Sequence, residues 1–380
     1  MNHGRAARAW EMMVGARALT LQEYFAKGHH NNFDFLRFFA ACLVLFGHSF
    51  TLLEATPQFK FPSDPVTKAI FPYLPFGQGL PGTGVHIFFF ISGLLVTRSF
   101  MNAQGDVWRF ARARLLRIGP AFWVNTLLVA LVLGPLMSDL APTAYFANGT
   151  TWQYILRNIP FWPLQVHLPA VFQSIPFAPA VNGSIWTIPL ELQMYVWVVI
   201  LGVIGVLRQR LVFLSFFAAI TLYYCITGAS YMFVTSTGEP RLWVFFFWGM
   251  LACIYAPKIL VSPRLLLLMS LPMAWLWQTQ TLWMQVLYAA WFGYALLVLV
   301  YVWPLRCLDM RRIGDVSYGI YLYCFPVQQT LISFFMPHLN GWGLAALTFV
   351  VTLPIAATSW HWVEKPALRR KRVPQATLPA

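Results

Sequence analysis

The first long apolar stretch of the chain contains an arginine and a histidine, Arg37 and His48, eleven positions apart. In a helix, eleven residues make three turns and roughly 16 Å of rise, so the two side chains would share one helix face, about half a bilayer apart. Ionisable groups inside a membrane are costly and are usually functional. The alternative is a snorkelling arginine and a histidine that hydrogen-bonds a neighbouring helix. The pair therefore predicts either a membrane-embedded active site or a polar helix contact.

A carboxylate falls at a similar expected depth. Glu191 lies about one and a half turns into an apolar stretch that runs in the opposite direction, so it would reach the level of His48. In a His48–Glu191 dyad the carboxylate orients the imidazole, which can then take a proton from a hydroxyl group as a general base. A purely structural hydrogen bond between the two side chains is the alternative.

Two further features could bind a ligand. Arg114 and Arg117 belong to a cluster of four arginines between residues 109 and 117, and with Arg37 they could grip a polyphosphate through two-pronged hydrogen bonds. Arginines in such loops are also ordinary topology signals. Ser92, next to Gly93 in an apolar stretch, is a further candidate contact, since this pair would let a slender ligand or another helix approach the backbone. The five cysteines form no CxxC pair, and we expect no metal site.

The elements that must position these residues are membrane helices. The chain is 59% hydrophobic and only 10% charged, whereas soluble globular chains carry about a quarter charged residues. We expect an all-α, polytopic integral membrane protein with about ten transmembrane helices. The expected spans cover residues 33–53, 82–100, 118–138, 186–207, 211–227, 241–256, 265–279, 283–303, 316–336 and 342–363.

The distribution of basic residues predicts the orientation of these spans. The net charge of +14 could suggest nucleic acid, but with a cytoplasmic N-terminus 22 of the 26 basic residues fall on the inner side. We therefore expect both termini in the cytoplasm and no nucleic-acid partner. The expected parts are a cytoplasmic N-terminal extension (1–30), a membrane domain (31–366) and a basic cytoplasmic tail (367–380). The outward segment 139–184 is rich in proline and aromatic residues, which favours a folded lid, with an interfacial aromatic belt as the alternative.

Six short motifs, each in an expected span or at the end of one, together resemble the acyltransferase-3 family of membrane O-acyltransferases. The resemblance covers about residues 31–366. The motifs are Arg37-x10-His48, Phe88-Phe89-Phe90-Ile91-Ser92-Gly93, Arg114-Leu115-Leu116-Arg117-Ile118-Gly119-Pro120, Trp186-Thr187-Ile188-Pro189-Leu190-Glu191-Leu192-Gln193-Met194-Tyr195, Gly314-Asp315-Val316-Ser317-Tyr318-Gly319-Ile320-Tyr321-Leu322-Tyr323 and Glu364-Lys365-Pro366.

The resemblance implies a multi-pass enzyme of the bacterial inner membrane. Such an enzyme moves an acyl group, usually acetyl, from cytoplasmic acyl-CoA to a hydroxyl group of a surface or periplasmic carbohydrate, such as a polysaccharide or a lipid-linked glycan. The resemblance further implies that His48 is the catalytic histidine and Glu191 its acidic partner. Arg37, Arg114 and Arg117 would contact the phosphates of CoA.

Two positions depart from the pattern of that family. The family often carries an acidic residue where this chain has His86 and a histidine where it has Cys324, so no family role is transferred to either. Buried charge also marks substrate paths, so a transporter or flippase, or a polymerase of lipid-linked glycans, is the alternative function. Transporters often show two-fold repeats and paired broken helices, and neither is evident in this sequence.

Overall fold

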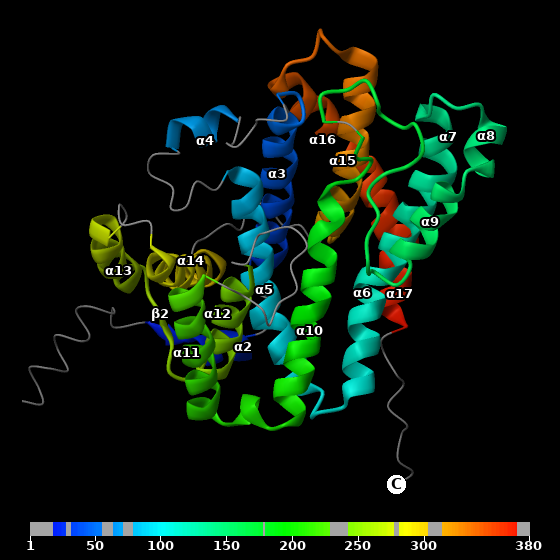
Figure 1. Ribbon diagram of the computed structural model, residues 1–380. Coiled ribbons are helices and arrows are strands. Elements are labelled where there is room, and N and C mark those ends of the chain that lie inside the picture. Colours follow the sequence, from blue (N-terminus) through cyan, green and yellow to red (C-terminus); the bar gives the residue numbers. More distant parts are fainter. Residues whose placement is uncertain are drawn as a thin grey trace, which may run out of the picture.

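A computed structural model describes residues 18–27, 32–54, 64–70, 79–177, 179–228, 242–276, 281–302 and 314–370, and these are mostly helical (Figure 1). The elements, in chain order, are β1 (Leu19–Thr20), α2 (Leu21–Ala26), α3 (Phe33–Thr51), α4 (Pro65–Ile70), α5 (Leu80–Asn102), α6 (Val107–Leu128), η3 (Val129–Leu133), α7 (Gly134–Met137), α8 (Pro142–Ala147), α9 (Gly149–Asn158), η4 (Ser184–Trp186), α10 (Thr187–Val203), η5 (Val206–Arg208), α11 (Arg210–Thr227), α12 (Leu242–Ile254), β2 (Leu260–Val261), α13 (Pro263–Leu276), α14 (Leu282–Tyr301), α15 (Ser317–Phe335), α16 (Gly341–Ser359), η7 (Trp360–Glu364) and α17 (Lys365–Arg369).

Each of the ten expected spans contains a helix, but not every helix is long and apolar enough to cross a membrane. Seven helical segments within the described ranges meet both conditions. Helices α12 and α13 have only 13 and 14 residues. Helix α15 has 19 residues, and its hydropathy is lowered by serine, threonine and glutamine side chains. The protein is a multi-pass helical membrane protein, while the count of ten spans and the cytoplasmic termini stay predictions.

Helix α5 packs between α3 and α12, and glycines allow its close contact with both. A Cβ atom on Gly93 would lie 2.0 Å from the carbonyl oxygen of Phe246 in α12, and one on Gly249 would lie 2.3 Å from that of Phe90. The helix approach predicted from the Ser92-Gly93 pair is thus confirmed. Because these backbones touch, α5 and α12 form a stiff centre against which the site is built.

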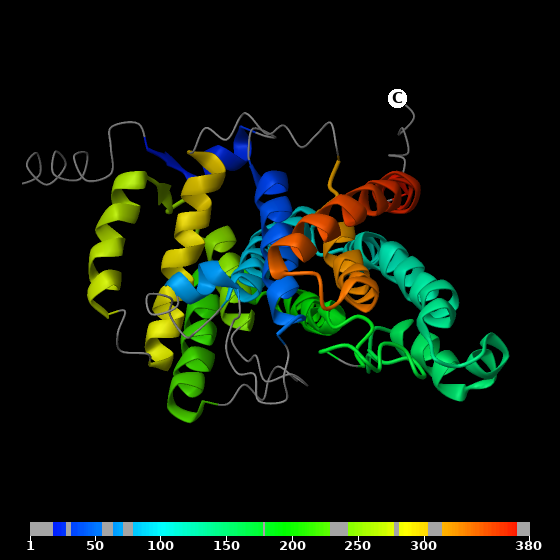
Figure 2. The same cartoon turned by 90° about the horizontal axis from the view of Figure 1, so that it is seen from above.

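Helices α15 and α16 pack on the other side of α3, so that α3 lies centrally when the molecule is seen from above (Figure 2). The side-chain amide of Gln328 in α15 donates hydrogen bonds to the carbonyl oxygen of Leu45 and to Oγ of Ser49, both at 2.8 Å. Gln328 and Ser49 are fully buried. Since Leu45 and Ser49 flank His48 along α3, these bonds fix the rotation of the turn that carries the histidine.

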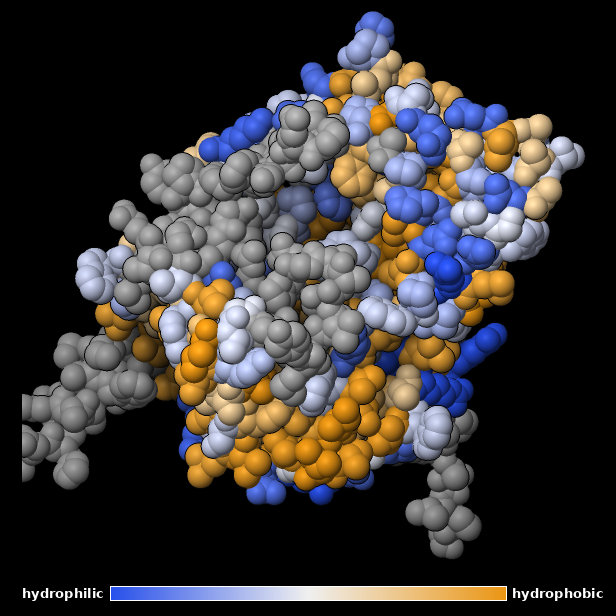
Figure 3. All heavy atoms as spheres, viewed as in Figure 1, coloured by the Kyte–Doolittle hydropathy of each residue, from blue (hydrophilic) through white to orange (hydrophobic). Residues whose placement is uncertain are grey.

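Apolar side chains cover the outside of α10 and α11. Leu211 and Ile226 in α11 are 76% and 73% exposed, and Val203 in α10 is 64% exposed. Figure 3 shows this apolar surface in the lower half of the view, with hydrophilic residues along the lower edge and at the upper right. Apolar groups exposed on this scale suit contact with lipid, because soluble monomers rarely expose such patches.

The segment between α7 and η4 folds back onto α15. The side-chain amide of Gln329 donates to the carbonyl oxygens of Phe177 and Ala180 at 2.9 and 2.8 Å. Asn182 donates to the carbonyl oxygen of Leu322 at 3.0 Å, and Tyr145 is fully buried. The segment is therefore a packed cap, as the lid interpretation predicts, and not a solvated linker.

A two-residue antiparallel ladder between β1 and β2 departs from the all-α prediction, as do two isolated β-bridges, Ser138 with Val171 and His167 with Ala180. It ties the end of the expected N-terminal extension to the helices, and Leu21 is fully buried there while Tyr24 stacks on Tyr301 at 4.8 Å. Residues 1–17 and 28–31 of the extension, and the tail beyond Arg370, lie outside the described residues.

Candidate active site

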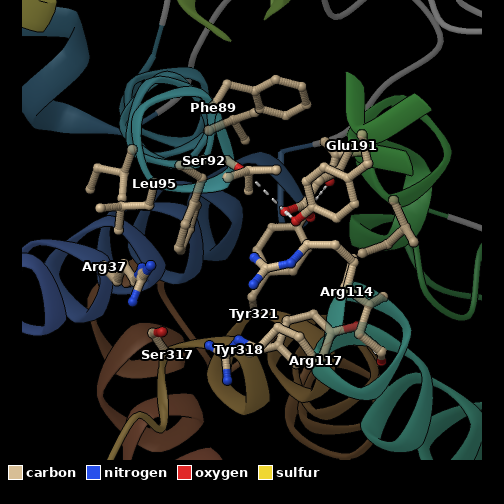
Figure 4. A pocket seen from close by; sticks show the side chains of 18 residues that line it. Arg37, Phe89, Ser92, Leu95, Arg114, Arg117, Glu191, Ser317, Tyr318 and Tyr321 are labelled. Atoms are coloured by element: carbon tan, nitrogen blue, oxygen red, sulfur yellow. Dashed lines mark hydrogen bonds between the residues drawn. The ribbon is translucent and has the colours of Figure 1, made fainter. Parts of the chain in front are cut away.

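One cavity of about 110 Å³ lies between α3, α5, α6, α10 and α15 (Figure 4). It brings together five of the six residues singled out from the sequence, whereas His48 does not line it. The lining residues are Arg37, Val85, Phe88, Phe89, Ile91, Ser92, Leu95, Val96, Arg114, Arg117, Ile118, Thr187, Ile188, Glu191, Tyr195, Ser317, Tyr318 and Tyr321. Three guanidinium groups and one carboxylate thus face a cavity that is otherwise mainly apolar and aromatic.

Two of the three guanidinium groups share one carboxylate. Oδ2 of Asp315 lies 2.6 Å from Nη2 of Arg117 and 3.7 Å from Nη1 of Arg37. Each arginine also has a second acidic neighbour: Nη1 of Arg117 lies 3.4 Å from Oε2 of Glu364, and Nη1 of Arg37 lies 3.4 Å from Oδ1 of Asp34. This network joins α3, α6 and the segment before α15 to the end of η7.

Asp315 remains ionised within this network. Burial raises the pKa of its carboxyl group, but the positive charges of Arg117 and Arg37 outweigh that effect and hold the pKa below its ordinary value. The Ser317 hydroxyl also donates a hydrogen bond to Oδ1 at 2.5 Å. Asp315 therefore acts as the counter-ion of both arginines.

Arg114 differs from Arg37 and Arg117 in its ion pairing. Among the described residues, no carboxylate lies within salt-bridge distance of its guanidinium group. Its neighbours are the rings of Phe110 and Tyr195, at 5.9 and 6.0 Å, and its Nε atom is buried without a hydrogen-bond partner. Figure 4 shows this side chain reaching toward the middle of the cavity. The cavity thus contains one cation that is open to an anionic ligand.

Glu191 forms its hydrogen bonds across the cavity to α5 and within α10. The Ser92 hydroxyl donates to Oε1 of Glu191 at 3.3 Å, and the Tyr195 hydroxyl donates to the same oxygen (Figure 4). No hydrogen bond joins Glu191 to His48 in the part of the chain that the structure describes. The expected dyad is therefore not formed in this arrangement, because Glu191 faces α5 rather than the turn of α3 that carries His48.

His48 does not line the cavity and has different neighbours. Its ring meets the edge of Phe325 at 5.7 Å between centroids, and its Nδ1 atom is buried without a hydrogen-bond partner. One turn earlier on α15, Tyr321 lines the cavity, donates to the carbonyl oxygen of Ser184 and accepts from the Thr187 hydroxyl at 2.6 Å. Helix α15 thus lines the cavity with Tyr321 and contacts the histidine with Phe325, one turn further along.

Asp315, Glu364, Tyr195 and Tyr321 are site residues that the sequence analysis assigned no role. A signal was present, since the chain has only 12 acidic residues, and Asp315 and Glu364 each directly flank an apolar span. Asp315 and Glu364 lie 198 and 247 positions away from their partner Arg117 in the sequence, so only the folded arrangement identifies the pairs. No group of three His, Cys, Asp or Glu side chains that could hold a metal ion is found in the described ranges.

The chain belongs to the acyltransferase-3 family, whose acyltransferase domain matches residues 30–361, and it is an O-acyltransferase. The match covers the cavity, the ion network up to Asp315, and His48. The family match favours acyl transfer over the two alternative functions, transport and glycan polymerisation.

Several named relatives match the chain, and the printed name of one of them is O-acetyl transferase. Nodulation protein 10 of Rhizobium leguminosarum bv. viciae is 30% identical over 368 residues, which cover 90% of this chain and 95% of that protein. The O-acetyl transferase of Shigella phage Sf6 is 26% identical over 365 residues, 90% of this chain and 96% of that protein. A shorter match, 28% over 176 residues, is to the regulator of hypoxia-inducible factor 1 of Caenorhabditis elegans and covers 43% of this chain and 32% of that protein. No solved structure matches the chain.

Proposed function

We propose that the protein transfers an acetyl group from acetyl-CoA, bound from the cytoplasmic side of a bacterial inner membrane, to a hydroxyl group of a carbohydrate on the other side. The observation that carries this proposal is the cavity, in which the side chains of Arg37, Arg114 and Arg117 converge inside an apolar helix bundle. Guanidinium groups bind phosphates through bidentate hydrogen bonds, and CoA carries several phosphate groups. The printed name of the phage relative, O-acetyl transferase, supports acetyl as the transferred group.

The donor would extend along α15 from the arginines toward His48. Tyr318 and Tyr321 line the cavity in successive turns, and Phe325 follows one turn further, against the histidine. Arg37 and His48 lie on one helix with roughly 16 Å of rise between them, which is the separation that a phosphate site and a thioester site at opposite ends of an extended arm require. The thioester reaches His48 when the side chains of Tyr321 and Phe325 move aside.

His48 is the proposed general base. It removes the proton from the acceptor hydroxyl group while the hydroxyl oxygen attacks the thioester carbonyl carbon; the carbon–sulfur bond then breaks and CoA leaves as the thiolate, which takes up the proton. Its Nδ1 atom is not tied to another group in the described residues, so no hydrogen bond must break for this nitrogen to act. A covalent acyl-histidine is the alternative route.

Glu191 is proposed to act on His48 through its charge and not through a direct hydrogen bond. Its two bonds are to Ser92 and Tyr195, which hold the carboxylate at the wall of the cavity. In a water-poor bundle a carboxylate at this position stabilises the positive charge that His48 gains when it takes the proton. Ser92 is the proposed contact of the donor arm on α5.

The test uses labelled acetyl-CoA and inverted inner-membrane vesicles that contain either the wild-type protein or His48→Gln. Label should reach a carbohydrate only with the wild type. A parallel comparison of surface polysaccharide from wild-type and deletion strains by mass spectrometry and NMR identifies the ester and its position. Equal labelling of carbohydrate with both proteins, or no ester lost on deletion, would contradict the proposed function.

A further inference from the structure

The arginines that line the cavity differ in whether a carboxylate neutralises their charge. Asp315 is the carboxylate that two of them share. One oxygen of this carboxylate lies 2.6 Å from Arg117 and 3.7 Å from Arg37, yet Asp315 itself does not line the cavity. Its side chain is only 15% exposed. It therefore approaches the two guanidinium groups from behind, leaving their other face toward the cavity.

Each of the three participants keeps a partner if these contacts break. Arg117 retains Glu364 at 3.4 Å, Arg37 retains Asp34 at 3.4 Å, and Asp315 retains the Ser317 hydroxyl at 2.5 Å. Separating a buried ion pair is costly chiefly because it leaves a charge without compensation. Here the cost is lowered, since no group would be left alone.

We propose that Asp315 is a resident counter-ion which holds Arg37 and Arg117 in the empty cavity and releases them to the phosphate groups of the entering acyl donor. Arg114, which has no carboxylate partner among the described residues, makes the first contact with the incoming phosphate. A phosphate group then replaces Asp315, because it offers more acceptor oxygens and more negative charge to the same two planar groups. The identity of the donor rests on the proposed function; the exchange itself concerns any polyphosphate.

This exchange makes Asp315 a competitor of the ligand. The apparent affinity for a phosphate ligand falls as the fraction of molecules in which Asp315 pairs with both arginines rises. Removing the charge while keeping the shape, with Asp315→Asn, should therefore tighten binding. A residue that only positioned the arginines would have the opposite effect, because its loss would let them move away.

The experiment is a binding titration of purified wild-type protein and Asp315→Asn with coenzyme A, inorganic pyrophosphate and pantetheine, which lacks the phosphates. We expect Asp315→Asn to lower the Kd for coenzyme A and for pyrophosphate about three- to tenfold, the scale of one partly exposed ion pair. Pantetheine should bind both proteins equally. The matched control is Asp139→Asn, an exposed carboxylate that forms no ion pair among the described residues; it should change these Kd values less than about twofold.

The outcomes separate this inference from the proposed function. If coenzyme A binds neither protein, the donor is wrong, and pyrophosphate alone decides the exchange. Equal or weaker pyrophosphate binding by Asp315→Asn would overturn the exchange whatever the donor is. Should the variant fail to fold, a structure of the wild type with pyrophosphate decides instead: the exchange requires Asp315 to lie beyond 4 Å from Arg117 with phosphate oxygens in its place, and an unbroken Asp315–Arg117 contact refutes it.

Discussion

Helix α3 carries Arg37 near one end and His48 near the other, in contrasting surroundings. At one end Arg37 lies in an ion network with Asp34 and Asp315, beside a cavity that it lines. At the other end His48 packs against Phe325, outside that cavity, and its Nδ1 atom has no partner in the described residues. The same helix thus presents a compensated cation at one end and an uncommitted base at the other.

In the proposed reaction, this contrast assigns donor binding to one end of the helix and proton transfer to the other. Permanent charges inside an apolar bundle are costly without compensation, so Arg37 and Arg117 lie beside protein carboxylates, whereas Arg114 has no carboxylate partner among the described residues. A neutral imidazole needs no counter-ion, and it remains available for proton transfer only if its nitrogen is not already used. Changes at the His48 end should therefore remove turnover, whereas changes at the Arg37 end should alter stability and donor binding.

The largest effect is expected at the uncommitted base. His48→Gln should lower the rate of acetyl transfer by about 10² to 10⁴, because glutamine can hydrogen-bond but cannot accept the proton. The rate is measured on purified protein that elutes as a folded species in detergent. His338→Gln, at an exposed position, serves as the control and should retain full activity. Robust turnover by folded His48→Gln would remove this residue from the mechanism.

A loss of stability is expected where one arginine compensates two carboxylates. Arg117→Ala leaves Asp315 and the fully buried Glu364 without their common partner, and we expect the free energy of unfolding to fall by about 2 to 4 kcal/mol. Denaturant titration in mixed micelles measures the change. Arg109→Ala, at an exposed position in the same helix, should fall by less than about 0.5 kcal/mol. Equal losses in the two variants would show that the network contributes nothing.

A binding defect without a loss of the chemical step is expected at Arg37. Arg37→Lys keeps the charge but loses the planar pair of donors, so KM for acetyl-CoA should rise about three- to tenfold while kcat stays near that of the wild type. Steady-state kinetics at several donor concentrations separate the two constants. An unchanged KM in well-expressed protein would return Arg37 to the role of a structural, snorkelling side chain.

The smallest effect is expected at Glu191. Glu191→Gln removes the charge but keeps an oxygen that accepts hydrogen bonds from Ser92 and Tyr195, so activity should fall less than about tenfold. Single-turnover rates of this variant and of His48→Gln, measured side by side, test whether the loss at Glu191 is the smaller of the two. A loss at Glu191 as large as that at His48 would indicate a direct contact between them during the reaction.

The sequence predicted the helices and the grouping of Arg37, Arg114 and Arg117, because apolar runs, buried charge and motif order are local signals. It placed Glu191 with His48 and not with the arginines, whereas the cavity brings Glu191 and Ser92 together with them. It did not predict which way Glu191 faces. Counting residues along a helix gives the depth of a side chain but not the side of the helix bundle that it meets, and α10 turns Glu191 toward Ser92. The expected His48–Glu191 hydrogen bond failed for this reason.

For a related reason, the sequence alone could not identify the counter-ions of Arg117. Asp315 and Glu364 stand in motifs quoted for the family resemblance, yet their partner Arg117 is 198 and 247 positions distant along the chain. Pairing at such distances depends on how α15 and η7 pack against α6. No periodicity or local spacing encodes that packing, so the carboxylates could be seen in the sequence but not matched to an arginine.

The bond between Arg117 and Glu364 has a consequence for biogenesis. A ribosome synthesises Arg117 long before Asp315 and Glu364, so the helix that carries it must enter the membrane while its guanidinium group has no protein partner. Until η7 emerges, that charge has to stay near the lipid head groups, where phosphates can compensate it. The contact between Arg117 and Glu364 therefore forms only after η7 has been made, and the ion network beside the cavity is completed later than the helices that carry its arginines.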